Sequence, residues 1–268
     1  MYNSARLTYN FKVMTSHPFR LAAALATLVG SVHAADPAPA AKAEDIPKVG
    51  LVFWISADHV EQADGAVAVL QDRSGKDNHA RPKRGPGIVP TNPIVVKDAA
   101  SAQSVLRFSG ENCCFSFNQL SDILTGFCVV SKDPTAFGTR NELCVFGAKD
   151  SNDLHTGWKD DVIYNETVER VHLSKMAADG KQWLNGHPIK AQKTPWPQQL
   201  GVFSFTTAGP VRVGQIGRDR NMASRTWKGE IAEILLYNTV LSDADRVAVE
   251  KYLLAKYAIK PELPAPAK

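Results

Sequence analysis

The chain has 268 residues, of which 44% are hydrophobic and 22% are charged, and its formal net charge is +4. An apolar fraction of this size is enough for a folded core and excludes a disordered chain. No dense run of Lys and Arg occurs, and this argues against a nucleic-acid partner, because phosphate binding needs a strongly basic face.

The N-terminal segment has the pattern of a secretory signal peptide. Arg6, Lys12 and Arg20 precede the apolar run "LAAALATLVG" and the small residues of "SVHAAD". We expect residues 1–34 to be removed and the mature protein to be secreted or periplasmic, since the apolar run is too short to span a bilayer. Their removal lowers the Lys and Arg count from 31 to 28 against 27 acidic residues, so the formal charge falls from +4 to +1.

The rest of the chain divides by composition into three parts. Residues 35–46, "ADPAPAAKAEDI", are rich in Pro and Ala and predict a linker. Residues 47–260 show no internal break and predict one domain. Residues 261–268, "PELPAPAK", form a short Pro-rich tail.

Short β-branched and aromatic runs dominate the domain. They include "LVFWISA", "SVLRFSG", "GFCVVS", "KQWLNG", "LGVFSFTT", "PVRVGQIG" and "EIAEILLYN", separated by Gly, Asn, Asp and Pro. Asp179-Gly180 and Asn185-Gly186 have the composition of hairpin turns. The pattern predicts an all-β fold, a two-sheet antiparallel sandwich, because a single sheet would leave an apolar face in water.

One helix is expected, over "LSDADRVAVEKYLLAKYAI" near the C-terminus. Ser242 is a suitable N-cap, and Asp243 and Asp245 favour the positive end of the helix dipole. An apolar stripe formed by Val247, Leu253, Leu254 and Tyr257 would pack this helix against the sandwich.

The cysteines allow two interpretations. Cys113 and Cys114 are adjacent, and neighbours rarely form a disulfide with each other. Cys128 and Cys144 lie in strand-like runs, where they are either core residues or partners in a bridge. No zinc-ligand spacing appears in the sequence.

Several segments resemble bacterial laminin-G-like, or concanavalin A-like, jelly-roll domains. The closing stretch "WKGEIAEILLYNTVLSDADRVAVEKYLLAKY" is similar to the last strand and helix of that family. "LVFWISADHV", "LQDRSGKDNHARP", "VLRFSGEN" and "KQWLNG" are similar to its earlier landmarks and occur in the same order. The resemblance covers about residues 47–260 and implies a concanavalin A-like jelly roll with a C-terminal helix.

The resemblance implies a function only broadly, since this architecture includes lectins, adhesion modules, glycosidases and structural domains. We expect an exported, non-catalytic module that binds a glycan or an extracytoplasmic protein. The alternative is a structural or assembly domain of a cell-envelope complex, and a glycosidase with an atypical site comes third. No nucleophile elbow and no phosphate-binding loop appears in the sequence.

Glu230 and Glu233 in "GEIAEILLYN" test the glycosidase interpretation. Retaining glycosidases need two carboxyl groups about 5–5.5 Å apart, which on a strand requires positions i and i+2. Here the spacing is three, so without a bulge the two side chains point to opposite faces. Glu233 is then a buried acid that needs a partner, for which Arg246, Arg218 or Arg220 is a candidate.

The segment "QDRSGKDNHA" contains Asp72, Asp77 and Asn78, whose oxygen atoms are suitable ligands for Ca²⁺. The same residue types are also those that tight turns require, and we favour the turn. Ca²⁺ is the only cofactor for which the sequence offers candidate ligands.

The predicted ligand-binding residues lie in "LHTGWKDDVIYN": His155, Trp158, Asp160, Asp161 and Tyr164. An aromatic face followed by carboxylates suits the ring and hydroxyl groups of a sugar. The alternative is that Trp158 covers the core and the acids are solvated. Trp196, between two prolines in "TPWPQQ", is either an exposed platform or a lid over the sandwich edge.

Overall fold

The structure is a computed structural model that describes residues 42–83, 91–110, 112–139, 145–151, 153–157, 161–165, 173–220 and 225–263. All of these residues belong to one compact unit, Pro39–Lys268. The predicted signal peptide, residues 1–34, lies outside the described residues.

The elements follow one another along the chain mostly as strands. In order they are η1 (Ala43–Asp45), β1 (Leu51–Ser56), β2 (Val60–Ala63), β3 (Ala66–Leu70), β4 (Arg81–Pro82), β5 (Ile94–Lys97), β6 (Ser104–Ser109), β7 (Phe115–Lys132), η2 (Pro134–Ala136), β8 (Phe146–Gly147), α1 (Lys175–Ala178), β9 (Lys181–Leu184), β10 (His187–Ile189), β11 (Gly201–Ile216), β12 (Lys228–Tyr237) and α2 (Asp243–Lys256).

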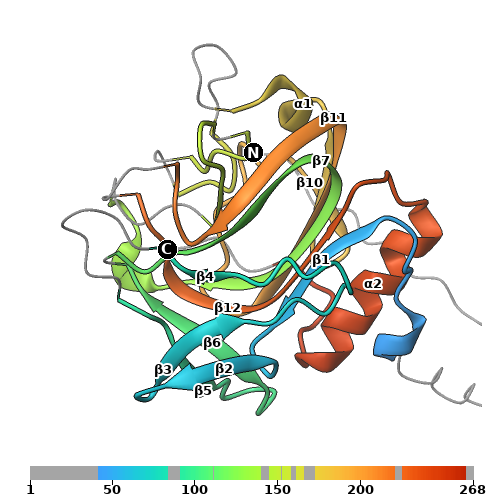
Figure 1. The fold of residues 1–268 in the computed structure, drawn as a ribbon. Helices are drawn as coiled ribbons and strands as arrows, with labels where there is room; N and C mark the ends of the chain where they lie inside the picture. The colour runs from blue at the N-terminus through green and yellow to red at the C-terminus, as the bar shows by residue number, and fades with distance from the viewer. Residues whose placement is uncertain are drawn as a thin grey trace, which may run out of the picture. The chain divides into compact units, whose positions relative to one another are not determined.

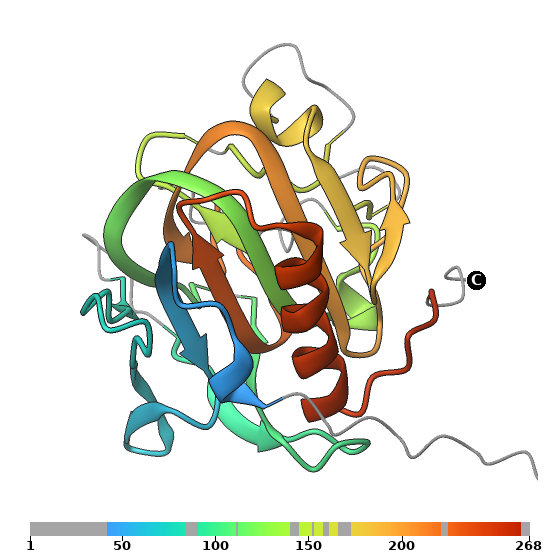
Figure 2. The same cartoon turned by 90° about the vertical axis from the view of Figure 1, so that its right-hand side faces the viewer.

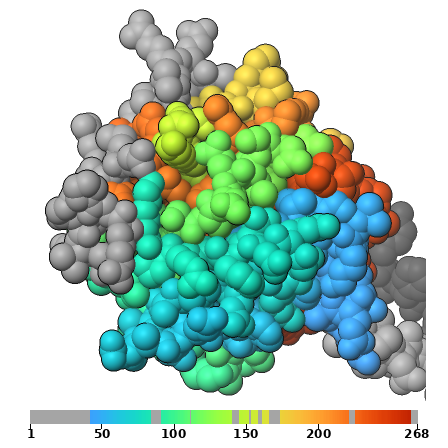
Figure 3. All heavy atoms as spheres, viewed as in Figure 1, coloured from blue at the N-terminus to red at the C-terminus, as the bar shows by residue number. Residues whose placement is uncertain are grey.

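The strands form a large antiparallel sheet and a small one. The large sheet has the order β10-β9-β11-β7-β12-β6-β5, with β1 paired to β12, β4 to β7 and β8 to β11, while β2 and β3 form a separate hairpin. On the face seen in Figure 3, the segments from β2 to β6, coloured cyan and teal, cover the lower half. The predicted all-β antiparallel sandwich with a C-terminal helix is confirmed.

The two longest strands, β7 and β11, are antiparallel neighbours in the large sheet. Figure 1 shows them curving together through the molecule. Their pairing is regular from Gly201 to Thr206 and then shifts before Val211. Gly209 and Pro210 lie at this irregularity, where proline supplies no ladder N–H and the pairing is interrupted.

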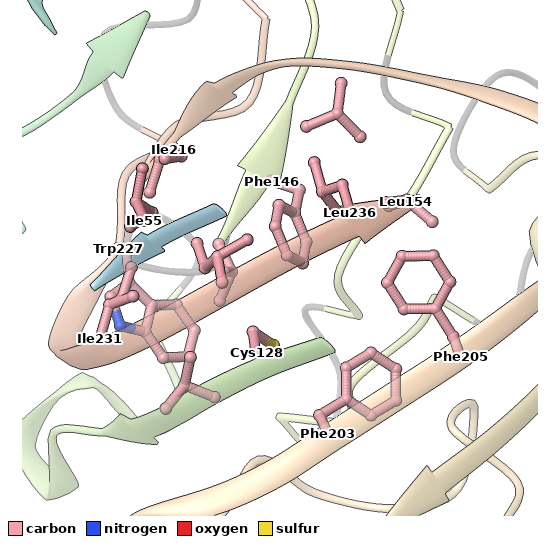
Figure 4. Close-up of a cluster of buried hydrophobic side chains, with 14 of the residues drawn as sticks. Ile55, Cys128, Phe146, Leu154, Phe203, Phe205, Ile216, Trp227, Ile231 and Leu236 are labelled. Carbon is pink, nitrogen blue, oxygen red and sulfur yellow. The ribbon is translucent and has the colours of Figure 1, made fainter. Parts of the chain in front are cut away.

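The main core lies inside this curved sheet. Figure 4 shows Cys128 from β7, Phe203 and Phe205 from β11, and Ile231 and Leu236 from β12 directed into one cluster. All five side chains are at most 1% exposed. The interior is therefore filled by side chains from the strands that the sequence identified as apolar.

A second core lies on the opposite face of the same strands, beneath α2. Figure 2 shows the helix lying across the sheet. Phe127, Leu235 and Tyr237 from the sheet pack there against Val249 and Leu253 of the helix. Both faces of β7 and β12 are buried at this point, which explains why their sequences do not alternate between apolar and polar residues.

The C-terminal helix begins as predicted. The Ser242 side chain accepts a hydrogen bond from Asp245 N at 3.1 Å and donates one to the Asp245 carboxylate. Its buried face differs in part from the predicted stripe: Leu253 and Tyr257 are buried as predicted, but Val247 and Leu254 are only half-buried. The residues Val249 and Tyr252 take their places in the interface.

One of the two predicted hairpin turns is confirmed. Asn185 and Gly186 join β9 to β10 with positive φ angles of 52° and 82°. Asp179-Gly180 instead ends the short helix α1 before β9. A side chain at Gly180 would lie 2.0 Å from the Thr206 carbonyl oxygen, so the glycine is required by the close approach of β11.

The described cysteines are core residues. Cys113, Cys114 and Cys128 are buried free thiols, and Cys144 lies outside the described residues. Trp196 is also buried, 3% exposed, with its ring centroid 5.1 Å from that of Trp227. Among the described helices none is long and apolar enough to cross a membrane.

Candidate binding site

Three of the predicted ligand-binding residues lie in the interior. The exposed fractions are 0% for His155, 6% for Asp161 and 3% for Tyr164. Trp158 and Asp160 lie outside the described residues. The structure therefore does not bring the three described residues to a common surface, and ligand binding at this segment stays a prediction.

His155 belongs to a buried polar cluster. Its Nδ1 lies 2.5 Å from the Thr156 carbonyl oxygen, and its Nε2 lies 3.8 Å from a carboxylate oxygen of Asp219. Arg225 donates a hydrogen bond to the same carboxylate at 2.9 Å. These contacts connect the 155–157 segment to the chain that leads into β12.

Tyr164 and Asp161 have separate interior partners. The Tyr164 ring packs edge-to-face against Phe203 with centroids 5.7 Å apart, and burial raises the pKa of its phenol well above the ordinary value. Asp161 forms an ion pair with Lys132 and accepts a hydrogen bond from Gly138 N at 2.8 Å. Neither polar group is directed toward solvent.

The predicted calcium segment forms a turn held by Asp72. Its carboxylate accepts hydrogen bonds from Trp54 N, Ser74 N and Asn78 N and from the Ser74 hydroxyl. The Asn78 amide donates to the Val52 carbonyl oxygen at 2.8 Å.

Asp77, the third candidate ligand, has a side chain that is 95% exposed. Within the described ranges no group of three or more His, Cys, Asp or Glu side chains is placed to hold a metal ion. The Asp72, Asp77 and Asn78 side chains serve the turn and its surface, and a Ca²⁺ site there stays a prediction.

The predicted orientation of Glu230 and Glu233 is wrong. The register between β12 and β7 shifts between Ile231 and Glu233, which places a β-bulge at Ala232. The extra residue changes the alternation of side chains, so both glutamates lie on the face covered by α2. Tyr257, which follows the helix, binds Glu233 and lines a groove together with Glu230.

The Glu233 carboxylate is nevertheless held by four hydrogen-bond donors. Its carboxylate accepts hydrogen bonds from Trp54 Nε1 at 2.6 Å, Tyr257 OH at 2.9 Å and Lys256 Nζ at 2.8 Å, with Tyr252 OH at 3.3 Å. The predicted partners Arg246, Arg218 and Arg220 are wrong, because the end of α2 reaches this position instead.

These contacts change the acidity of the surrounding groups. Burial by itself lowers the pKa of Lys256, but the Glu233 carboxylate outweighs this effect and the net pKa is raised. Burial and the same carboxylate raise the pKa values of Tyr252 and Tyr257. Lys256, Tyr252 and Tyr257 therefore keep their protons at neutral pH, so one cation and two neutral phenols surround the Glu233 side chain.

Glu230 is held by a different cation. Its carboxylate lies 2.6 Å from the Arg107 guanidinium, across the β12–β6 pair. The two glutamates share a face, but each has its own positive partner. This arrangement fits structural carboxylates rather than an acid and a nucleophile across one bond.

The groove lined by Glu230 is a candidate for ligand binding. It has a volume of about 630 Å³ and is lined by side chains from six separate segments, with the chain after α2 along one side. The lining residues are Asp98, Ala99, Ala100, Ser131, Asn185, Gln198, Gln199, Leu200, Glu230, Tyr257, Ala258, Ile259, Lys260, Glu262 and Leu263. We call it the tail groove.

The wall formed by the tail is attached to the β9–β10 turn. Asn185 Nδ2 donates to the Glu262 carbonyl oxygen at 2.8 Å, and His187 Nε2 lies 2.7 Å from the Pro261 carbonyl oxygen. Asn185 Oδ1 accepts from Val202 N at 2.9 Å, so one amide connects the turn, β11 and the tail. Figure 2 shows this segment, in red, leaving the lower end of α2.

The groove combines amides, carboxylates and apolar side chains. Gln198 and Gln199 are exposed on one wall, and Ile259 and Leu263 contribute apolar surface. Glu230 is paired with Arg107, but the other two carboxylates, Asp98 and Glu262, still outnumber the cation Lys260 within the lining. The groove therefore suits a neutral ligand that carries many hydroxyl groups better than an anionic one.

Comparisons with known proteins assign no family to this chain. No family model and no curated protein matches the chain. A structure of Trypanosoma rangeli sialidase in complex with sialic acid aligns at 16% identity with a TM-score of 0.41, and one of the sialidase alone at 13% and 0.37. Each alignment covers 81% of this chain and 34% of the sialidase, so this chain spans about a third of their length.

Most of the tail groove was missed at the sequence level. Its lining residues are far apart in the chain and carry no motif. The Asn185-Gly186 turn was the one usable signal, since it located a polar side chain at the end of a hairpin. Nothing in the sequence showed that residues 261–263 fold back onto that turn.

Proposed function

We propose that this protein is an exported binding module without catalytic activity, and that it holds a neutral glycan in the tail groove. The groove itself is the observation that carries the proposal. Its volume of about 630 Å³ lies in the range of small-molecule sites, which are about 300–1,000 Å³. The resemblance to laminin-G-like domains and the signal-like N-terminus agree with this proposal.

The groups that line the groove match the chemistry of sugars. The amides of Gln198 and Gln199 can both donate and accept hydrogen bonds, as paired sugar hydroxyls require. Ile259 and Leu263 offer apolar surface to the C–H face of a ring. The excess of carboxylates disfavours sulfated or uronic acid polymers through charge repulsion.

The non-catalytic part of the proposal is supported by the two glutamates of β12. Glu233 is completely buried, and Glu230 is paired with Arg107. A retaining mechanism would require one carboxyl group to attack and the other to transfer a proton across a shared substrate. Carboxylates that are already held by separate cations are poorly placed for that task.

A glycan array tests the proposal. The purified protein should bind neutral oligosaccharides, and the double substitution Gln198→Ala and Gln199→Ala should weaken binding at least tenfold. The matched control is Gln62→Ala, an exposed glutamine on β2 outside the groove lining, which should bind normally. Circular dichroism of both variants establishes that the fold is retained.

Other outcomes would contradict the proposal. Binding that survives the double substitution but is lost in Trp158→Ala would move the site to the predicted 155–164 segment. A stoichiometric protein partner with no glycan binding would favour the assembly domain. Hydrolysis of a labelled oligosaccharide by the purified protein would overturn the non-catalytic interpretation.

A further inference from the structure

The pair formed by Lys132 and Asp161 is almost completely shielded from solvent. Lys132 is the last residue of β7, and its side chain is 0% exposed, while the Asp161 side chain is 9% exposed. The ammonium nitrogen contacts the carboxylate oxygen Oδ1 directly. The Phe137 ring lies 4.9 Å from the same nitrogen and covers the contact.

The backbones on both sides are fixed. Lys132 N donates to the Pro197 carbonyl oxygen at 2.8 Å, and the Asp161 carbonyl oxygen accepts from Trp196 N at 3.0 Å. Residues 195–197 thus hold β7 and the 161–165 segment together. The backbones that carry the amine and the carboxyl group are therefore held close to each other.

The two oxygens of Asp161 have different surroundings. Oδ1 contacts Lys132 Nζ, whereas Oδ2 accepts a hydrogen bond from Gly138 N at 2.8 Å. A backbone N–H directed at one oxygen stabilises negative charge that develops on it during attack at the carbonyl carbon. The other oxygen lies beside the amine, where it can receive protons and leave.

We propose that Lys132 and Asp161 condense to an isopeptide bond. The reaction starts from the ion pair with the transfer of a proton from Nζ to Oδ1, which gives a neutral amine and acid in a site with little water to solvate separate charges. Nζ then attacks Cγ to form the N–C bond, with negative charge on Oδ2. Oδ1 takes a second proton from nitrogen and leaves as water, and the Cγ–Oδ2 double bond re-forms.

Amide formation from an amine and an acid is unfavourable in water, and the fold offsets this in two ways. Two groups held in contact act at an effective concentration of about 10⁵–10⁸ M, which offsets the unfavourable balance of amide formation in solution. Expulsion of the water product from a closed site makes the step one-directional. The bond would join residues that are 29 positions apart in the sequence.

The chain contains a matched contact that should not react. Lys256 also pairs with a buried carboxylate, Glu233, at 2.8 Å. The Lys256 side chain is 15% exposed, whereas that of Lys132 is 0% exposed. Solvent therefore reaches the Lys256 ammonium group and stabilises its charge, and this pair remains ionic.

Mass spectrometry of the purified wild-type protein decides the question. The intact mass should be lower than the sequence mass by one water molecule. Tryptic digestion should give residues 108–140 joined to residues 160–170, because an acylated Lys132 is not cleaved. Lys132→Arg should restore the full mass, since guanidinium is not a nucleophile at neutral pH.

The control and the contrary outcomes come from the same digest. Cleavage after Lys256 should be complete, as for an ordinary lysine. A wild-type protein with the full sequence mass and complete cleavage after Lys132 would show an ion pair only. A water loss confined to a single peptide, such as a succinimide, would also overturn the proposal.

Discussion

At the scale of single residues, several charged groups in the described interior have specific partners. Glu250 on α2 accepts hydrogen bonds from Ser204 and from Arg246, at 2.5 and 2.6 Å. Glu233 and Asp161 each lie beside a lysine. Such groups are costly to bury alone, so the loss of one partner should cost more than the contact contributes.

Glu233→Gln should lower the free energy of unfolding by roughly 2–3 kcal/mol, somewhat less than the usual cost of breaking a fully buried pair. The amide keeps the shape but leaves Lys256 with only the half-exposed Asp58 carboxylate, at 3.3 Å, as a counter-charge, and its NH₂ group meets other donors. The loss is moderated because Lys256 is 15% exposed. Urea denaturation at pH 7 measures it.

The control for this variant is Glu230→Gln. Its partner Arg107 has a side chain that is 56% exposed, so the change should stay below about 1 kcal/mol. Equal losses in the two variants would mean that burial does not set the strength of these pairs.

At the scale of elements, α2 shows how a local signal and a distant contact combine. Its start is determined locally by Ser242, and its C-terminal turn is fixed by contacts of Lys256 and Tyr257 with β12. The sequence pattern located the helix correctly. It predicted that Val247 packs against the sheet, but Val247 is only half-buried, because an apolar stripe in the sequence does not show how the helix is rotated against the sheet.

Ser242→Ala should destabilise the protein by about 1 kcal/mol, the usual cost of losing an N-cap. The substitution removes the side-chain acceptor for Asp245 N. Thermal unfolding followed by circular dichroism measures the effect. Ser242→Asp retains an acceptor and should stay near wild type; if it lost as much as alanine, the cap would not be the cause.

At the scale of the whole molecule, the sheet is buried on both faces where β7 and β12 cross beneath α2. Some titratable groups in the two cores are buried in their neutral forms. Burial raises the pKa of the Cys113 and Cys114 thiols to about 12. Burial also raises the pKa of Tyr237 above its ordinary value.

Because the Cys113 and Cys114 thiols are buried in their neutral forms, we expect the protein to lose stability at alkaline pH. The thiols ionise near pH 9 in the unfolded chain but only near pH 12 in the folded one. Stability is therefore complete below pH 9 and falls from pH 9 to pH 12, by roughly 1 kcal/mol per thiol between pH 9 and 10. Urea denaturation across this range under reducing conditions should show the decline.

The double substitution Cys113→Ala and Cys114→Ala provides the comparison. Whatever its stability at neutral pH, its decline between pH 9 and 10 should be shallower than that of the wild type. Parallel pH profiles would rule out the two thiols as the cause.

How much the sequence could predict depended on the distance between the residues involved. The strands, the Asn185-Gly186 turn and the Ser242 cap follow from neighbouring residues, whose propensities and spacing act locally. The bulge at Ala232 could not be foreseen, since it depends on register with β7, and it reversed the predicted orientation of Glu230 and Glu233. The burial of His155, Asp161 and Tyr164 was missed for a similar reason, because polar residues enter a core only when distant partners receive them.

By itself, then, the sequence determined that this chain forms an antiparallel β-fold with one helix at its end, because hydrophobic patterning and capping are short-range properties. The tertiary structure alone decided which carboxylates are paired, that Lys132 meets Asp161, and that the tail closes a groove against the β9–β10 turn. Those features arise from side chains brought together across the fold, and their energies depend on burial that only the assembled core provides.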